Sequence, residues 1–249
     1  MLRAASHLKG TSIAATDGEI GSVQDLYFDD HRWTVRYLVV DTGTWLPGRQ
    51  VLISPRSIVA VTDEEKIAVS LTKSQVENSP STEVDKPVDR QYEEEYAQYY
   101  GYPYYWTGPY LWGASPFPSE GPVGVSQPAA PMPPRGGEGD PTLRSTANVT
   151  GYYIEATDGD IGHVEDFIVD TAAWAIRYML VDTRNWWPGK KVLVAPEWIN
   201  RVSWPDSRVY VDMSREAIKG APEYDPDQPL ARDYETRLFG HHNRRVYWD

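Results

Sequence analysis

The stretch IAATDGEIGSVQD at residues 13–25 occurs again, slightly varied, as IEATDGDIGHVED at residues 154–166. The same spacing relates RYLVVDT at 36–42 to RYMLVDT at 177–183, so the likeness extends well beyond one motif. Similarity at a fixed spacing over this length is typical of a duplicated structural unit. The chain is therefore predicted to hold two tandem copies of one domain.

The two copies leave one stretch of the chain without a counterpart. The first copy is predicted over residues 8–106 and the second over 148–249, and each is long enough to bury a modest core. Residues 107–147 between them are rich in Pro and Gly, a composition that does not support a packed core. This stretch is predicted to be an extended linker, and a proline-rich docking segment is the alternative.

Each copy is predicted to be mainly β. Asp17-Gly18 and Asp158-Gly159 are hairpin dipeptides, because both residue types can take the positive φ that a type I′ turn requires. Short apolar runs lie between such turns, and Val35–Val40 is nearly continuous, as in a strand covered on both faces. Short strands with tight turns favour a small, closed, six-stranded β-barrel, which leaves no exposed sheet edge.

The end of each copy changes from the strand period to the helix period. Tyr92, Tyr96 and Tyr99 recur at i, i+4 and i+7 in the first copy, and Tyr234 and Leu238 recur at i and i+4 in the second. This spacing places the side chains on one face of a helix. Each barrel is therefore predicted to be followed by a short amphipathic helix.

An aromatic tail follows each predicted helix. The tail after the first helix reads YYGYPYYWTGPYLW at residues 99–112, and its Tyr105-Trp106 pair returns as Tyr247-Trp248 at the end of the second copy. Large rings of this kind stack well on the surface of a partner, and packing on the chain's own domains is the alternative. The candidate interaction residues are Tyr104, Tyr105, Trp106, Tyr247 and Trp248.

The two copies are predicted to pair with each other in an approximate two-fold arrangement, with the aromatic tails at or near the contact. A tandem duplication often fuses what was once a symmetric dimer. Exposed ring surface is also costly, at about 25 cal/mol per Å² of apolar area. A flexible linker of this length spans tens of ångströms, so it does not prevent the pairing.

The ordered set TDGEIGSVQD, RYLVVDTG and VLISP, present twice, resembles the PRC-barrel domain. That domain is named for the cytoplasmic part of the photosynthetic reaction-centre H subunit, and it also forms the C-terminal part of a ribosome-maturation factor. The tails look like the extension of bacterial tandem PRC-barrel proteins. The positions that carry the repeated signature are Asp17, Gly18, Gly21, Asp25, Arg36 and Asp41, with Asp158, Gly159, Gly162, Asp166, Arg177 and Asp182 in the second copy.

The charged members of this signature lie among apolar strands. Asp25, Arg36 and Asp41 are predicted to form an Asp–Arg pair that braces one end of the barrel. Paired acids for proton transfer are the alternative. The likeness to the H subunit, which places acids near a quinone proton path, suggests this alternative but matches no residue of that path.

The acidic composition narrows the classes of partner. The chain has 36 Asp and Glu against 24 Lys and Arg, a net charge of −12. Binding along a phosphate backbone needs clustered Lys and Arg, so no direct nucleic-acid binding is expected. No segment has the apolar length of a membrane span or of a signal peptide, so a cytoplasmic protein with no membrane span is expected.

The sequence offers little for catalysis or for cofactors. Without cysteine, disulfides, thiolate metal sites and cysteine nucleophiles are excluded. The GxSxG, P-loop and HExxH motifs are absent, as is a GxGxxG that opens a helix. His241 and His242 are adjacent, so on a helix they do not form the i, i+4 pair that binds a metal. No catalytic residue, cofactor or metal ligand is predicted, and the protein is not expected to be an enzyme.

These features predict a non-catalytic tandem PRC-barrel protein that serves other proteins as an interaction or scaffold module. The likeness to the H subunit implies a first alternative, an accessory of photosynthetic or other membrane electron-transfer complexes. The likeness to the ribosome-maturation factor implies a second, an RNA or ribosome-assembly adaptor, and the acidity counts against it.

Overall fold

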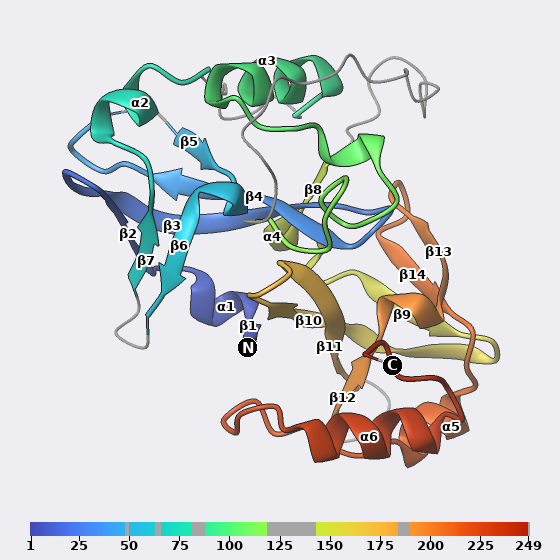
Figure 1. Cartoon of the computed structure of the whole chain (residues 1–249). Helices are drawn as coiled ribbons and strands as arrows, with labels where there is room; N and C mark the ends of the chain where they lie inside the picture. The colour runs from blue at the N-terminus through green and yellow to red at the C-terminus, as the bar shows by residue number, and fades with distance from the viewer. Residues whose placement is uncertain (48–49, 63–65, 81–87, 119–142, 184–189, 249) are drawn as a thin grey trace. The chain divides into compact units, whose positions relative to one another are not determined.

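The computed structural model of the chain describes residues 1–47, 50–62, 66–80, 88–118, 143–183 and 190–248 (Figure 1). It divides into two compact units, and each unit draws on both sequence copies. The first-copy unit consists of His7–Ser145 and Thr171–Ala175. The second-copy unit consists of Met1–Ser6, Thr146–Asp170 and Ile176–Asp249.

Each unit is built on one mainly antiparallel part of the sheet, called here the sheet of that unit, and the two parts have the same strand order. The order is β6-β7-β2-β3-β4-β5 in the first-copy unit, with β8 beside β3, and β13-β14-β9-β10-β11-β12 in the second-copy unit, with β1 beside β10. The strands of the first are β2 (Ser12–Ala15), β3 (Gly18–Asp29), β4 (Thr34–Asp41), β5 (Gln50–Ile53), β6 (Ile58–Val61), β7 (Lys66–Val69) and β8 (Leu143–Ser145). The strands of the second are β1 (Leu2–Ala4), β9 (Tyr153–Ala156), β10 (Gly159–Asp170), β11 (Ala175–Asp182), β12 (Lys191–Val194), β13 (Ile199–Ser203) and β14 (Arg208–Val211).

The two halves are similar and β-rich, but their sheets are not closed into barrels, so the prediction of closed six-stranded barrels was wrong. In the described part of the chain no ladder joins β5 to β6, or β12 to β13. The reason lies in the connection between these strands. Pro55 and Pro196 begin the short 3-10 helices η1 (Pro55–Ser57) and η3 (Pro196–Trp198). Proline cannot donate to a ladder, and each helical turn leads the chain away before it pairs again.

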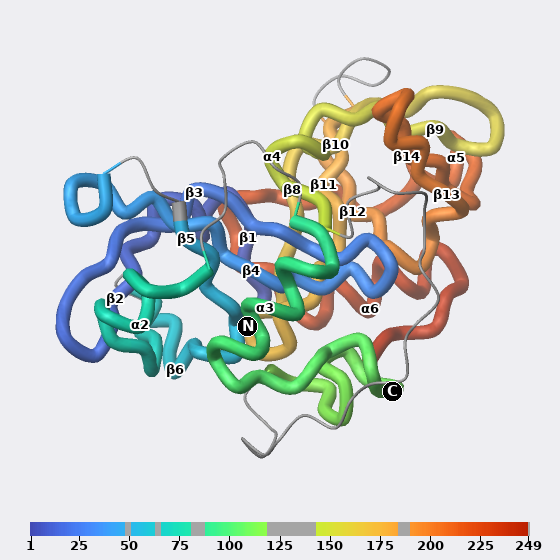
Figure 2. The backbone as a smooth tube through the Cα atoms, turned by 90° about the horizontal axis from the view of Figure 1, so that it is seen from above, coloured from blue at the N-terminus to red at the C-terminus, as the bar shows by residue number. Residues whose placement is uncertain are grey.

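The long hairpin of β3 and β4 forms the middle of the first-copy sheet, and the two strands run side by side in both views (Figure 1, Figure 2). Gly21 lies where β3 closely approaches Asp41: its φ is +141°, and a Cβ there would overlap the carbonyl oxygen of Asp41. Gly162 repeats the arrangement with a φ of +146° against Asp182. Gly21 and Gly162 are therefore places where no side chain fits.

The helices follow the strands as the tyrosine spacing predicts. In α3 (Arg90–Tyr100), the side chain of Asp89 accepts a hydrogen bond from the amide of Tyr92 at 2.8 Å and begins the helix. Tyr96 then lies in the core, where its hydroxyl donates to the carbonyl of Leu52 at 3.0 Å. The remaining helices are α1 (Ala5–Leu8), α2 (Lys73–Glu77), η2 (Tyr105–Thr107), α4 (Thr146–Val149), α5 (Arg215–Gly220) and α6 (Arg232–His241). Within the described ranges, no helix has the length and apolar character needed to cross a membrane.

Both ends of the predicted linker have structure of their own. At its start, Trp112 is buried and its indole N–H donates to the carbonyl of Ala173 at 2.8 Å. At its end, β8 pairs with β3 and α4 begins. The Pro- and Gly-rich middle of the predicted linker, residues 119–142, lies outside the described residues.

Candidate functional site

The candidate site is a cluster of charged and aromatic side chains that is present once in each unit. In the first-copy unit its centre is Arg36 on β4, whose side chain is 1% exposed. The Nε and Nη2 atoms of Arg36 donate to one carboxylate oxygen of Asp29, at 3.1 and 2.5 Å. Its Nη1 donates to the carbonyl of Leu111 at 2.6 Å. The guanidinium therefore joins the end of β3 to the segment of residues 108–118, which follows the Tyr105-Trp106 pair.

Asp29 is held in its charged form by several donors. Its carboxylate accepts the backbone amides of His31 and Arg32 at 3.0 Å each, in addition to Arg36. Burial raises the pKa of Asp29, but the charge and the hydrogen bonds of Arg36 outweigh burial, and the pKa lies below its ordinary value. A buried carboxylate that stays ionised in this way is a poor proton carrier near neutral pH.

The aromatic tail packs on its own unit through the same cluster. The ring of Tyr105 lies 3.6 Å from the guanidinium carbon of Arg36, and its hydroxyl donates to Glu93 at 2.7 Å. Glu93 is fully buried on α3 and pairs with Arg90 at 3.0 Å. Arg90 in turn lies 4.0 Å from the ring of Trp106. Tyr104 completes the series, because its ring stacks on Trp106 at 4.6 Å.

The second-copy unit repeats this arrangement. Arg177 on β11 donates to Asp170 at 3.1 Å, and its guanidinium carbon lies 4.2 Å from the ring of Tyr247. The hydroxyl of Tyr247 donates to the buried carboxylate of Glu235 at 2.9 Å. As in the first copy, an arginine one helical turn earlier completes the cluster: Arg232 pairs with Glu235 at 3.0 Å and lies 4.0 Å from the ring of Trp248.

The two clusters differ in how deeply the central arginine is buried. Arg177 is 22% exposed, whereas Arg36 is covered by Leu111 and Trp112. In the second-copy unit, Tyr178 adds a further hydroxyl that donates to Glu235 at 2.7 Å. Burial first, and then the hydrogen bond to Glu235, raise the pKa of Tyr178 well above its ordinary value. Each cluster therefore ties a strand, a helix and a tail together through charged side chains, among which the helix glutamate, Glu93 or Glu235, is buried.

The segment of residues 108–118 is fixed by arginines that bind its main chain. Arg32 donates to the carbonyls of Gly108, at 2.9 Å, and of Tyr110. Arg56 donates to the carbonyls of Trp112 and Pro118, at 2.7 and 3.2 Å. The aromatic side chains that this segment leaves at the surface are Tyr110, 53% exposed, and Phe117, 40% exposed.

The other signature acids serve turns and strand contacts. Asp17 and Asp158 accept the first backbone amides of α2 and α5, at 2.8 and 2.7 Å. Asp41 accepts the amide of Gly43 at 2.9 Å, whereas Asp182 is completely buried. None of these acids is the partner of Arg36.

Asp25 and Asp166 occupy equivalent places on β3 and β10. Asp25 pairs with Lys9 at 3.4 Å and accepts the hydroxyl of Ser145. Asp166 accepts the backbone amide and the hydroxyl of Ser6. Ser145 is the last residue of β8, and Ser6 lies two residues after β1, so in both units this carboxylate binds a serine in or near a short strand from the other copy.

Sequence reasoning missed four of the residues that build the clusters. Asp29 and Asp170 provide the carboxylates for the central arginines, and Glu93 and Glu235 bind the tail tyrosines. A signal was present, because each of these acids is repeated between the copies and each glutamate follows an arginine by three residues.

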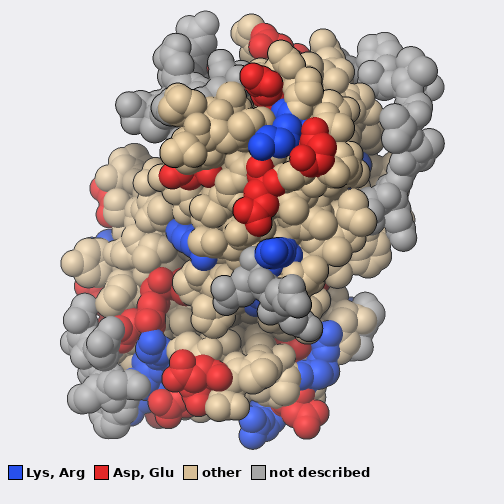
Figure 3. Space-filling model, turned by 90° about the vertical axis from the view of Figure 1, so that its left-hand side faces the viewer, with Lys and Arg blue, Asp and Glu red and all other residues tan. Residues whose placement is uncertain are grey.

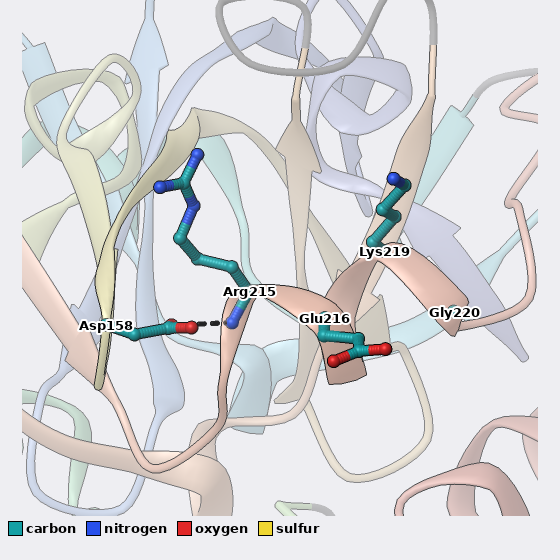
Figure 4. Close-up of a pocket in the computed structure, with 5 residues that line it drawn as sticks. All are labelled: Asp158, Arg215, Glu216, Lys219 and Gly220. Carbon is teal, nitrogen blue, oxygen red and sulfur yellow. Dashed lines mark hydrogen bonds between the residues drawn. The ribbon is translucent and has the colours of Figure 1, made fainter.

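A hollow of about 610 Å³ lies in the second-copy unit (Figure 4). The carboxylate of Asp158 faces the backbone of Arg215 there, and Glu216 extends away from the side chains of Arg215 and Lys219. These residues do not pair a nucleophile with a base, and Asp158 is engaged in starting α5. The lining residues are Asp158, Arg215, Glu216, Lys219 and Gly220.

The two adjacent histidines have separate surroundings. The Nε2 atom of His241 lies 2.8 Å from the carbonyl of Ala217, while the ring of His242 packs 4.8 Å from Trp198. Burial, and then the charge of His241, lower the pKa of His242 to about 4. In the part of the chain that the structure describes, no three His, Asp or Glu side chains are placed to hold a metal ion.

Residues 2–75 match the family model described as "PRC-barrel domain", and this part of the chain is a PRC-barrel domain. An "Uncharacterized protein" of Deinococcus radiodurans is 40% identical over 109 residues, which cover 41% of this chain and 39% of the relative. The chain thus spans well under half the length of that relative.

Proposed function

We propose that this protein is a non-catalytic interaction module that binds other proteins through the segment of residues 108–118. The observation that carries the proposal is the way this segment is held. Arg32, Arg36 and Arg56 bind its main-chain carbonyls, so the backbone is fixed while Tyr110 and Phe117 remain at the surface. Rigid aromatic side chains lose little entropy on binding and are common anchors at protein interfaces.

This binding segment belongs to the first copy alone. The positions of Arg32 and Arg56 are taken by Ala173 and Glu197 in the second copy, so the same clamp is not repeated there. The pair of arginines Arg32 and Arg56 therefore distinguishes the first copy from the second. A partner with an apolar pocket for an aromatic ring fits the exposed side chains.

The charged groups support a binding role more than a catalytic one. Asp29 and Glu93 are buried in ion pairs that join strand, helix and tail, and both are used by the protein itself. On the face shown in Figure 3, acidic side chains lie beside basic ones, without a broad basic surface. Together with the net charge of −12, this distribution favours proteins over nucleic acids as partners.

Affinity capture with matched variants tests this proposal. The unaltered chain, the double variant Tyr110→Ser/Phe117→Ser and the control Val59→Ser would be used as baits in extracts of the native host. Val59 is 71% exposed on β6, so the control also removes exposed apolar surface. Partners should be retained by the control and lost by the double variant. Equal capture by all three baits would overturn the proposal.

The captured proteins also distinguish the two alternative functions. Subunits of a membrane redox complex would favour an accessory of photosynthetic or other electron-transfer complexes. Ribosomal proteins would favour the RNA or ribosome-assembly adaptor. Either set supports the proposed binding segment only if Tyr110→Ser/Phe117→Ser removes it.

A further inference from the structure

Each sheet contains one short strand that comes from the other sequence copy. Leu2–Ala4 precedes the first copy but pairs with β10, with Leu2 opposite Asp170 and Ala4 opposite Ile168. Leu143–Ser145 precedes the second copy but pairs with β3, with Leu143 opposite Asp29 and Ser145 opposite Tyr27. The two pairings are in the same register, because the spacing between the copies relates Leu2 to Leu143 and Asp29 to Asp170. The copies have therefore exchanged strands reciprocally.

By sequence, the strand Leu2–Ala4 belongs to the first domain, although it pairs in the second-copy unit. The match to the PRC-barrel domain starts at residue 2, so Leu2–Ala4 is part of the first domain by sequence. Its contacts lie in the second-copy unit. The amino group of Met1 lies 3.6 Å from Asp170, and Ser6 donates to Asp166. The chain enters the first-copy unit only at His7.

The two acceptor edges accept nearly the same strand. The strand Leu-Arg-Ala (Leu2–Ala4) pairs with β10, and the strand Leu-Arg-Ser (Leu143–Ser145) pairs with β3. The repeated carboxylate accepts a serine hydroxyl in both cases, from Ser6 at Asp166 and from Ser145 at Asp25. Each contact comprises three residue pairs. A ladder this short opens at small cost compared with the whole unit, and the strand that leaves exposes a sheet edge ready to pair again.

We propose that these edges are docking surfaces for a second copy of this chain, which inserts its own Leu2–Ala4 into β10 of the first molecule. Domain swapping exchanges an identical element between molecules, so every contact formed within one chain forms equally well between two. The choice between them depends on concentration. Within one chain, the tethered strand competes at an effective concentration in the millimolar range. Exchange between chains should therefore increase when folding takes place at high protein concentration.

Disulfide trapping between two full-length chains tests the proposal, because the chain has no cysteine of its own. A tagged Ala4→Cys chain and an untagged Ile168→Cys chain would be unfolded together, refolded and oxidised. Directly opposed residues on antiparallel strands lie within the Cα separation that a disulfide accepts. The matched control replaces Ile168→Cys with Val59→Cys, an exposed position in the first-copy unit that does not oppose Ala4.

The expected result is a mixed disulfide dimer that increases with protein concentration during refolding and reaches about tenfold more than the control. A mixed dimer no more abundant than the control at every concentration would overturn the proposal. Ser145→Cys with Tyr27→Cys provides the same test at the other edge, so a folding defect from Ile168→Cys does not decide the outcome. The proposed aromatic binding segment is not involved, so the two proposals can fail separately.

Discussion

Arg36 and Arg177 occupy the same place in the two copies but have different surroundings. Both guanidinium groups pair with the aspartate at the end of the preceding long strand and pack on the tail tyrosine. Arg36 is 1% exposed and Arg177 is 22% exposed. The repeated arginine is therefore more completely buried in the first-copy unit than in the second-copy unit.

Arg36→Ala should lower the free energy of unfolding more than Arg177→Ala. Without Arg36, Asp29 is left buried without its cation, and removing one partner of a buried pair costs about 3–5 kcal/mol. Water reaches part of Arg177, so its loss should cost clearly less. Urea unfolding of the two variants measures the difference, and equal losses would contradict the role given to burial.

Asp29 should also make the stability depend on acidic pH. Its pKa is lowered in the folded protein, so its contribution is fully present above the pKa of an unfolded Asp, about 3.9. The contribution is lost as the pH falls through the lower folded pKa. Between about pH 5 and pH 2, the free energy of unfolding should fall less steeply for Asp29→Asn than for the unaltered chain. Parallel pH profiles would show that Asp29 does not contribute in this way.

The sequence indicated Arg36 but not its partner. The repeat between the copies groups Arg36 with Asp25 and Asp41, because all three recur in the second copy. The carboxylate that Arg36 actually pairs with, Asp29, depends on the register of the β3–β4 hairpin. That register places Asp29 opposite Thr34, so Arg36, two residues further along β4, lies diagonally across the same face. A one-residue change of register would send the two side chains to opposite faces, and no local pattern fixes it.

The elements were predicted best where their periodic pattern was long. The tyrosine spacing located α3, and the hairpin dipeptides located the starts of β3 and β10. The open ends of the sheets were missed because closure depends on whether β5 pairs with β6, which local patterns do not report. The three-residue strands β1 and β8 were missed because they are too short to show a period.

Gly21→Ala should destabilise the protein more than Gly10→Ala, although both glycines have positive φ. A Cβ at Gly21 would overlap the backbone of Asp41, whereas a Cβ at Gly10 meets no atom within 4 Å. The strained φ costs about 1–3 kcal/mol at either site, and the overlap adds to it only at Gly21. Thermal unfolding of the two variants would measure this, and equal melting temperatures would contradict it.

For the whole molecule, the duplication and the reciprocal strand exchange have a common explanation in the fusion of a strand-swapped dimer. Swapped elements are typical of dimers whose two chains complete each other, and a tandem duplication would place both chains of such a dimer on one polypeptide. The approximate two-fold pairing of the copies, with the aromatic tails at or near the contact, stays a prediction. Small-angle scattering should show one compact particle, and a dumbbell of two independent units would contradict the pairing.

Each sheet is completed by a strand from the other copy, and disulfide formation within one chain tests this exchange most directly. Ala4 lies opposite Ile168 in the exchanged arrangement, whereas without exchange Ala4 would take the place of Ser145 opposite Tyr27. The variants Ala4→Cys/Ile168→Cys and Ala4→Cys/Tyr27→Cys would be oxidised at low protein concentration. We expect the first to form an intrachain disulfide rapidly and the second to remain reduced. A disulfide in the second variant, with none in the first, would contradict the strand exchange.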